Sequence, residues 1–113
     1  MRQALVQKFI EMRASRRTFL PQWLFDGEAP WDMLLELYCA SLSGKRVELD
    51  AFVESGTVST SVSSRWLRAL ERAELVVVTR HMLGGPEIVA ISNQGHRALE
   101  SYFDTLDASS LLL

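Results

Sequence analysis

The most constraining feature of this sequence is a segment in which a strongly amphipathic helical pattern runs directly into a β-hairpin pattern. The helical part covers residues 60–73, with Ser59 as a suitable N-cap. Its apolar side consists of Trp66, Leu67 and Leu70, and its basic side of Arg65, Arg68 and Arg72. Two extended runs, residues 75–79 and 87–91, then flank the turn sequence 84–86 and predict two antiparallel strands. Any fold proposed for the chain has to join this basic helix to a hairpin.

The apolar spacing outside this segment predicts four more helices. They cover residues 2–17, the stretch from Pro30 to a stop at Gly44, residues 50–55 and residues 93–106. Pro21 ends the first of them, and the aromatic stretch 23–29 is typical of a packed loop. Val47 is expected in a short extended piece, and Ser92 is expected to cap the last helix.

This order of elements is that of the winged helix-turn-helix, in which the second helix of the turn enters the major groove of DNA and the hairpin reaches its flank. We therefore predict a mainly α (α+β) fold, with a two-stranded wing and flanking N- and C-terminal helices. The predicted organisation is an N-terminal helix and packed loop over residues 1–28, a winged helix-turn-helix domain over 29–107 and a frayed tail over 108–113.

The charge of the chain is unevenly distributed. The 113 residues include 12 Lys and Arg and 14 Asp and Glu, and this net charge of −2 argues against a uniformly basic nucleic-acid binder. Residues 1–20 nevertheless hold five basic and one acidic side chain, and residues 60–81 hold four basic and two acidic ones. The second concentration coincides with the amphipathic helix.

That helix begins with a series of hydroxyl side chains followed by an arginine, a composition suited to duplex DNA. We expect Arg65 to read a base edge, because a forked guanidinium matches guanine, and Arg68 to hold phosphate together with the serines. The contacts predicted on this helix are Thr60, Ser61, Ser63, Ser64, Arg65 and Arg68. Arg72 is expected to pair with a nearby acid, and Trp66 is expected to belong to the core.

A set of short motifs is spread over the stretch 31–103, about two thirds of the chain: Trp31-Asp32-Met33-Leu34-Leu35, Ser55-Gly56, Arg65-Trp66-Leu67, Ala69-Leu70-Glu71, Leu75, Ile91-Ser92 and Gly95. With these residues the stretch resembles a winged-helix domain of the MarR (multiple antibiotic resistance regulator) type, in particular small proteobacterial members. The resemblance implies a dimeric transcription regulator whose terminal helices pair. It also places Ser61, Ser64 and Arg65 at recognition-helix positions and Arg80 and His81 on the wing strand.

The terminal helices have apolar stripes that a domain of this size cannot easily cover by itself. These stripes, the predicted dimerisation residues, are Leu5, Phe9 and Met12 near the N-terminus and Leu99, Phe103 and Leu106 near the C-terminus. We therefore expect an isologous homodimer. The nearby arginines Arg13, Arg16 and Arg17 fit either a phosphate contact or a solvated face beside the dimer contact.

Other classes of function find no support in the sequence. The single cysteine, Cys39, is expected to be a buried structural thiol, and His81 and His96 lack partners at metal-ligand spacing. No phosphate-binding glycine loop and no nucleophilic triad is present, so we expect neither an enzyme nor a cofactor. No run is long enough to cross a membrane, and a cytoplasmic location is expected.

Two other functions remain open beside the leading one of a regulator that binds double-stranded DNA. The first is a winged helix that docks a protein partner without binding DNA. It is favoured by the acidic total charge, by Glu74 where the MarR family often has glycine, and by the uncharged wing tip 82–86. The second is a regulator gated by a small-molecule effector, in an aromatic pocket lined by Trp23, Trp31 and Tyr102.

Overall fold

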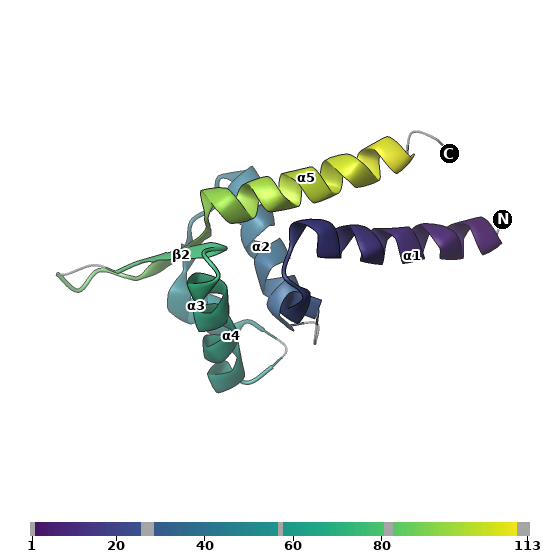
Figure 1. Ribbon diagram of the computed structural model, residues 1–113. Coiled ribbons are helices and arrows are strands. Elements are labelled where there is room, and N and C mark those ends of the chain that lie inside the picture. Colours follow the sequence, from purple (N-terminus) through teal and green to yellow (C-terminus); the bar gives the residue numbers. More distant parts are fainter. Residues whose placement is uncertain (1, 26–28, 57, 81–82, 111–113) are drawn as a thin grey trace.

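The computed structural model describes residues 2–25, 29–56, 58–80 and 83–110 (Figure 1). In chain order its elements are α1 (Arg2–Phe19), the 3₁₀ helix η1 (Gln22–Phe25), α2 (Ala29–Ser43), β1 (Val47–Glu48), α3 (Leu49–Glu54), α4 (Thr60–Arg72), β2 (Val76–Thr79), β3 (Ile88–Ile91) and α5 (Asn93–Ser110). The predicted element order is confirmed. The predicted loop after α1 contains η1, and α5 continues four residues beyond its predicted end at Leu106.

The sheet has three strands where the sequence predicted a two-stranded wing. Its order is β1-β3-β2, and both pairings are antiparallel. Val89 of β3 lies between Val78 of β2 and Val47 of β1. The short β1 satisfies backbone groups along the edge of β3 that a bare hairpin would leave to solvent, and the Leu49 amide extends this pairing by donating to the Glu87 carbonyl at 2.9 Å.

The hydrophobic core lies between α2, α4, the sheet and the start of α5. Its fully buried side chains include Leu24, Leu34, Leu37, Leu70, Leu99 and Val89. The first turn of α4 is capped as predicted, since the Ser59 hydroxyl accepts a hydrogen bond from the Val62 amide at 3.3 Å. The apolar side of α4 faces the core through Leu67 and Leu70, and the half-buried Trp66 packs against the core.

The end of α4 has a conformation that glycine usually supplies. Glu74 has a φ of 62°, and the Leu75 amide donates to the Leu70 carbonyl while the Glu74 amide donates to the Glu71 carbonyl, both at 3.0 Å. This pair of hydrogen bonds is a Schellman motif, whose left-handed residue favours glycine because it lacks a Cβ. Glu74 therefore adopts an unfavourable backbone conformation between α4 and β2.

The start of α5 is fastened to this same junction. The Ser92 hydroxyl donates to the Glu74 carbonyl at 2.6 Å and accepts from the Gly95 amide at 2.9 Å, so the predicted cap is confirmed. A Cβ at residue 95 would collide with the carbonyl oxygen of Leu75. Gly95 is thus required by the close approach of α5 to Leu75, which lies between α4 and β2.

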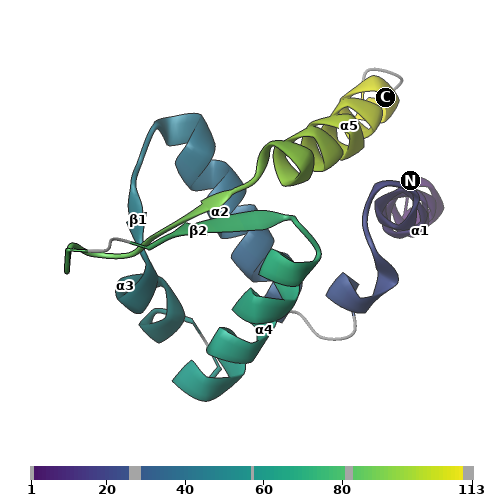
Figure 2. The same cartoon turned by 60° about the vertical axis from the view of Figure 1, so that its left-hand side comes forward.

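The terminal helices α1 and α5 run side by side away from the winged body (Figures 1 and 2). This arrangement elongates the molecule to 56 × 26 × 21 Å. No residue of α1 is buried, whereas the first half of α5 contributes Leu99 and Tyr102 to the interior. None of the helices in the described ranges is long and apolar enough to span a bilayer.

Candidate nucleic-acid interface

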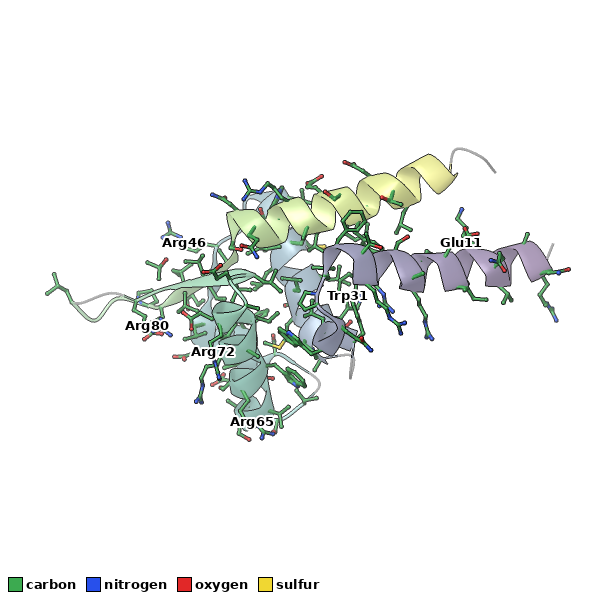
Figure 3. All side chains as sticks on the ribbon, viewed as in Figure 1. Glu11, Trp31, Arg46, Arg65, Arg72 and Arg80 are labelled. Atoms are coloured by element: carbon green, nitrogen blue, oxygen red, sulfur yellow. The ribbon has the colours of Figure 1, made fainter. Side chains whose placement is uncertain are left out.

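Helix α4 presents its polar side to solvent at the lower edge of the molecule in Figure 3, where Arg65 and Arg72 are labelled. The exposed residues of this side are Thr60, Ser61, Arg65, Arg68 and Arg72. Their common exposure follows from the helical spacing that buries Leu67 and Leu70 on the opposite side. Three guanidinium groups are therefore available along one face of the helix.

The structure corrects one predicted contact. The side chain of Ser63 is buried, with a relative exposure of 2%, and its hydroxyl lies against the backbone at Gly56. Ser63 therefore packs α4 against the turn that precedes it and does not reach the surface. Ser64, next along the helix, is half-buried and lines a hollow between α3, α4 and β2.

Arg80, at the end of β2, is held by a carboxylate of α4. Its Nη1 and Nη2 atoms donate to the two carboxylate oxygens of Glu71, at 3.1 and 3.4 Å. This hydrogen bonding and the charge of Glu71 raise the pKa of Arg80 above its usual value. Sequence reasoning missed Glu71, because nothing in the local pattern indicates which arginine a residue at the end of α4 will meet.

Arg72 was expected to be the arginine with an intramolecular partner. It is exposed, and within the described ranges it forms no ion pair. Glu71, its neighbour in sequence, pairs with Arg80 instead because it points toward β2. His81, the other predicted wing contact, lies outside the described residues, and the described part of the wing tip, residues 83–86, has no charged side chain.

Several of these side chains line one hollow beside α4. It has a volume of about 240 Å³ and lies between α3, α4 and β2. Its charged lining residues are Asp50, Arg68, Glu71 and Arg80. The Arg80–Glu71 pair thus shares a surface with Arg68, one of the predicted phosphate contacts.

The predicted effector-pocket aromatics pack in two separate groups. Trp23 stacks on Trp66 with ring centroids 6.0 Å apart, whereas Trp31 meets Tyr102 edge-on at 5.9 Å. The guanidinium of Arg16 lies over the ring of Trp31, 5.3 Å from its centroid, and over that of Phe25 at 4.3 Å. Arg16 therefore holds α1 against the body through cation–π contacts. The sequence had left open whether this arginine contacts phosphate or lies on a solvated face.

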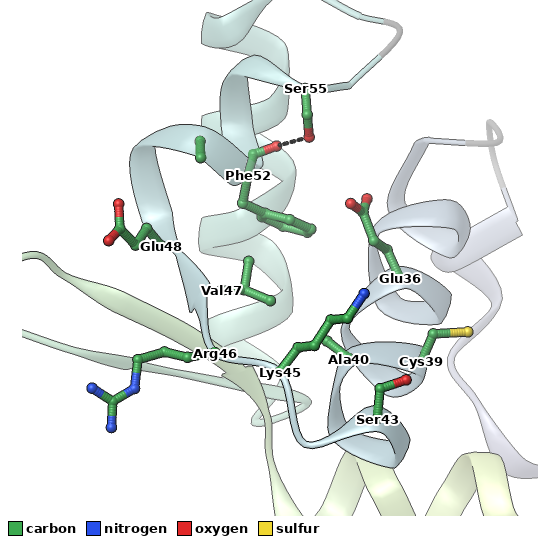
Figure 4. Close-up of a pocket in the computed structure, with 11 residues that line it drawn as sticks. Glu36, Cys39, Ala40, Ser43, Lys45, Arg46, Val47, Glu48, Phe52 and Ser55 are labelled. Carbon is green, nitrogen blue, oxygen red and sulfur yellow. Dashed lines mark hydrogen bonds between the residues drawn. The ribbon is translucent and has the colours of Figure 1, made fainter.

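Cys39 is exposed, which corrects the expectation of a buried thiol. It lines a hollow of about 590 Å³ between the end of α2 and α3, together with Glu36 and Lys45 (Figure 4). The neighbouring Tyr38 faces the other way, into the core. Successive side chains on a helix point about 100° apart, so Cys39 can face solvent while Tyr38 faces the core.

The predicted dimerisation residues divide into three kinds. Leu5 and Phe9 are 56% and 57% exposed, and Val6 and Ile10 beside them are 52% and 55% exposed. Met12, Phe103 and Leu106 are half-buried. Leu99 has no exposed surface, so it is a core residue of its own chain and not part of a dimer contact.

Comparisons with known proteins identify the fold. Neither family models nor curated proteins match the chain. Among solved structures, a MepR variant from a multidrug-resistant Staphylococcus aureus clinical isolate matches at a TM-score of 0.71 with 14% identity, over 98% of this chain and 76% of that one. A second S. aureus MepR variant, bound to an oligodeoxyribonucleotide, matches at 0.67 with 17% identity, over 99% and 80%. This chain has the MarR-type winged-helix fold.

The same fold extends beyond MepR. The protein AF1382 from Archaeoglobus fulgidus matches at a TM-score of 0.59 with 18% identity, over 74% of this chain and 89% of that one. The MepR matches extend over both terminal helices as well as the winged body, since they cover nearly the whole chain.

Proposed function

We propose that the protein is a cytoplasmic transcription regulator that binds duplex DNA through α4. The observation that carries this proposal is the exposed row of Arg65, Arg68 and Arg72 on the second helix of the helix-turn-helix. In this fold that helix enters the major groove. MepR, which shares the fold, has been solved bound to an oligodeoxyribonucleotide.

Within α4 we assign different roles to the two arginines that follow the hydroxyl series. Arg65 lies in the N-terminal half of the helix, where base-edge contacts are made, so it reads a base. Arg68, one turn further along, holds a backbone phosphate. Thr60, Ser61 and Ser64 supply hydroxyls to phosphate oxygens, while the buried Ser63 takes no part.

We also propose that the functional unit is a homodimer formed through the terminal helices. One face of α1 carries the apolar side chains of Leu5, Val6, Phe9 and Ile10, and each of these four residues is more than half exposed. A second copy of the chain would cover it. Because a two-fold axis relates the copies, the two α4 helices would reach half-sites one helical turn, about 34 Å, apart.

Fluorescence anisotropy with random-sequence duplex DNA at several salt concentrations tests DNA binding. The expected result is binding that weakens steeply with increasing salt and is lost in an Arg65→Ala/Arg68→Ala variant. The matched control is Arg46→Ala/Arg97→Ala, which removes the same charge from exposed positions outside α4. If the two double variants lose affinity equally, α4 is not the DNA-binding surface.

Single variants, each titrated into a high-affinity duplex and into random-sequence duplexes, separate the two roles. Arg65→Ala should cost about 1 to 3 kcal/mol and reduce sequence preference. Arg68→Ala should weaken binding to all duplexes alike and reduce the salt slope by about one. Identical effects on every sequence would contradict the division of roles.

Docking of a protein partner remains a second candidate function, favoured by the wing. Leu83 at its tip is fully exposed and Val77 on β2 is half exposed, and the described tip residues include no basic side chain to meet a phosphate. This function predicts no salt-dependent DNA binding by the wild-type protein even at low salt. It also predicts a partner that is released by Leu83→Asp.

A further inference from the structure

The Arg80–Glu71 pair joins the two parts of a winged helix that approach DNA from different sides. Glu71 lies in the last turn of α4, and Arg80 follows the last residue of β2, where the chain enters the wing. Both carboxylate oxygens of Glu71 are used, at 3.1 and 3.4 Å from the terminal nitrogens of Arg80. Two contacts between a planar fork and a carboxylate fix the orientation of the guanidinium as well as its position.

The pairing leaves Arg80 with unused hydrogen-bonding capacity. A guanidinium has five N–H donors, and Glu71 takes one from each terminal nitrogen, which leaves three. The side chain of Arg80 is 59% exposed, whereas that of Glu71 is 32% exposed. The carboxylate is thus the more sheltered partner, and the guanidinium is the one that faces solvent.

The surroundings place the pair beside the proposed DNA-binding face. Arg80 and Glu71 line the same hollow as Arg68 and Ser64, two of the proposed phosphate contacts, and Asp50 is the remaining charged group that lines it. Arg80 therefore lies between the basic face of α4 and the wing. A DNA backbone that contacts both elements passes this point.

From this geometry we infer that Glu71 is a positioning residue, which orients Arg80 so that its free N–H groups contact a DNA phosphate between α4 and the wing. The inference rests on the proposed DNA-binding function. Glu71 does not touch the DNA in this arrangement. Glu71 restricts the long Arg80 side chain before DNA binds, so Arg80 loses less conformational entropy on binding. For one flexible side chain, this entropy loss weakens the affinity by about twofold to tenfold.

A double-mutant cycle in DNA binding tests this role. The four proteins are the wild type, Arg80→Ala, Glu71→Ala and the double variant, each titrated into one duplex at several salt concentrations. Because one phosphate contact contributes a salt slope of about 0.9, Arg80→Ala should weaken binding of the wild type about eightfold at 0.1 M salt and reduce the slope by about one. Without Glu71, the same substitution should cost about fourfold or less.

The control for charge alone is Glu54→Ala, which removes an exposed acid at the end of α3 that has no ion-pair partner within the described ranges. The cost of Arg80→Ala should stay near eightfold in that background. Circular dichroism melting checks that each variant is folded, and a role in stability alone would leave the salt slope unchanged.

The alternative outcomes are distinct. If Arg80→Ala costs the same with and without Glu71, the two residues act independently and the inference fails. If it costs more without Glu71, the carboxylate withholds Arg80 from DNA, which is the opposite role. Failure of the wild type to bind any duplex would instead overturn the proposed function and this inference together.

Discussion

Helices α4 and α1 are both amphipathic in sequence, but the chain covers the apolar face of only one of them. In α4, Leu70 has no exposed surface and Leu67 is 6% exposed, because α2, α3 and β2 pack against it. In α1 no residue is buried, and Leu5 and Phe9 remain more than half exposed. The same kind of pattern has therefore produced a core element in one place and an open surface in the other.

The difference shows what an apolar stripe predicts. Helical spacing indicates that a face has to be removed from water, but it does not say whether the covering surface comes from the same chain. α1 meets α5 on one side only, so its other side is left to solvent in a single chain. We propose that a second copy of the chain buries this apolar face of α1.

The largest expected effect is on the stability of the single chain. Leu70→Ala should lower the free energy of unfolding by about 2 to 5 kcal/mol, because it removes a fully buried side chain and leaves a cavity. Phe9→Ala should change it little at protein concentrations where the chain is monomeric, since Phe9 is 57% exposed. Urea denaturation followed by circular dichroism measures both, and comparable losses would show that α1 is packed like α4.

The second prediction concerns self-association. Phe9→Asp should weaken the dimer at least tenfold, because a buried aromatic side chain contributes roughly 1.5 to 3 kcal/mol and the new carboxylate adds a desolvation cost. Sedimentation velocity over a range of concentrations gives the dissociation constant. Leu42→Asp is the matched control, since Leu42 is 61% exposed near the end of α2, outside the terminal helices. An equal effect of both substitutions would place the dimer contact elsewhere.

The parts of the fold that the sequence predicted are those decided by neighbouring residues. Ser59 and Ser92 were identified as caps because a hydroxyl at a helix start satisfies an amide two or three residues later. The turn at 84–86 and the β-branched run before it likewise indicated the hairpin without reference to the rest of the chain.

The parts that could not be predicted depend on distant partners. The extended conformation of Val47 was predicted, but its pairing as a third strand depends on the edge of β3, about forty residues away. Leu99 and Phe103 lie on one stripe of α5, yet Leu99 is in the core and Phe103 lies at its margin. The reason is that the start of α5 packs on the body, whereas its end extends away from it (Figure 1). For the site, the pairing of Glu71 with Arg80 depends on how α4 meets β2, which no local pattern encodes.

The third prediction concerns the end of α4. Glu74→Gly should stabilise the chain by about 1 kcal/mol, because glycine adopts a φ of 62° without the steric cost that a Cβ brings. Glu74→Ala removes the same charge but keeps the Cβ, so it should give no such gain. Thermal melting of the two variants separates backbone strain from charge, and a gain in both would assign the effect to the carboxylate.

The last prediction concerns the attachment of α5 to the winged body, and its effect is confined to alkaline pH. The Tyr38 hydroxyl donates to the Glu100 carboxylate at 2.8 Å, and burial together with this hydrogen bond raises the pKa of Tyr38 from 10.0 to about 12. Because the folded state favours the protonated phenol, its contribution to stability is fully present below pH 10 and is lost as the pH rises toward 12. In a Tyr102→Phe variant, where Tyr38 is the one remaining tyrosine, tyrosinate absorbance should therefore increase only near pH 12. Titration near pH 10 in the folded protein would show that Tyr38 is solvated and that α5 is attached to the body without this hydrogen bond.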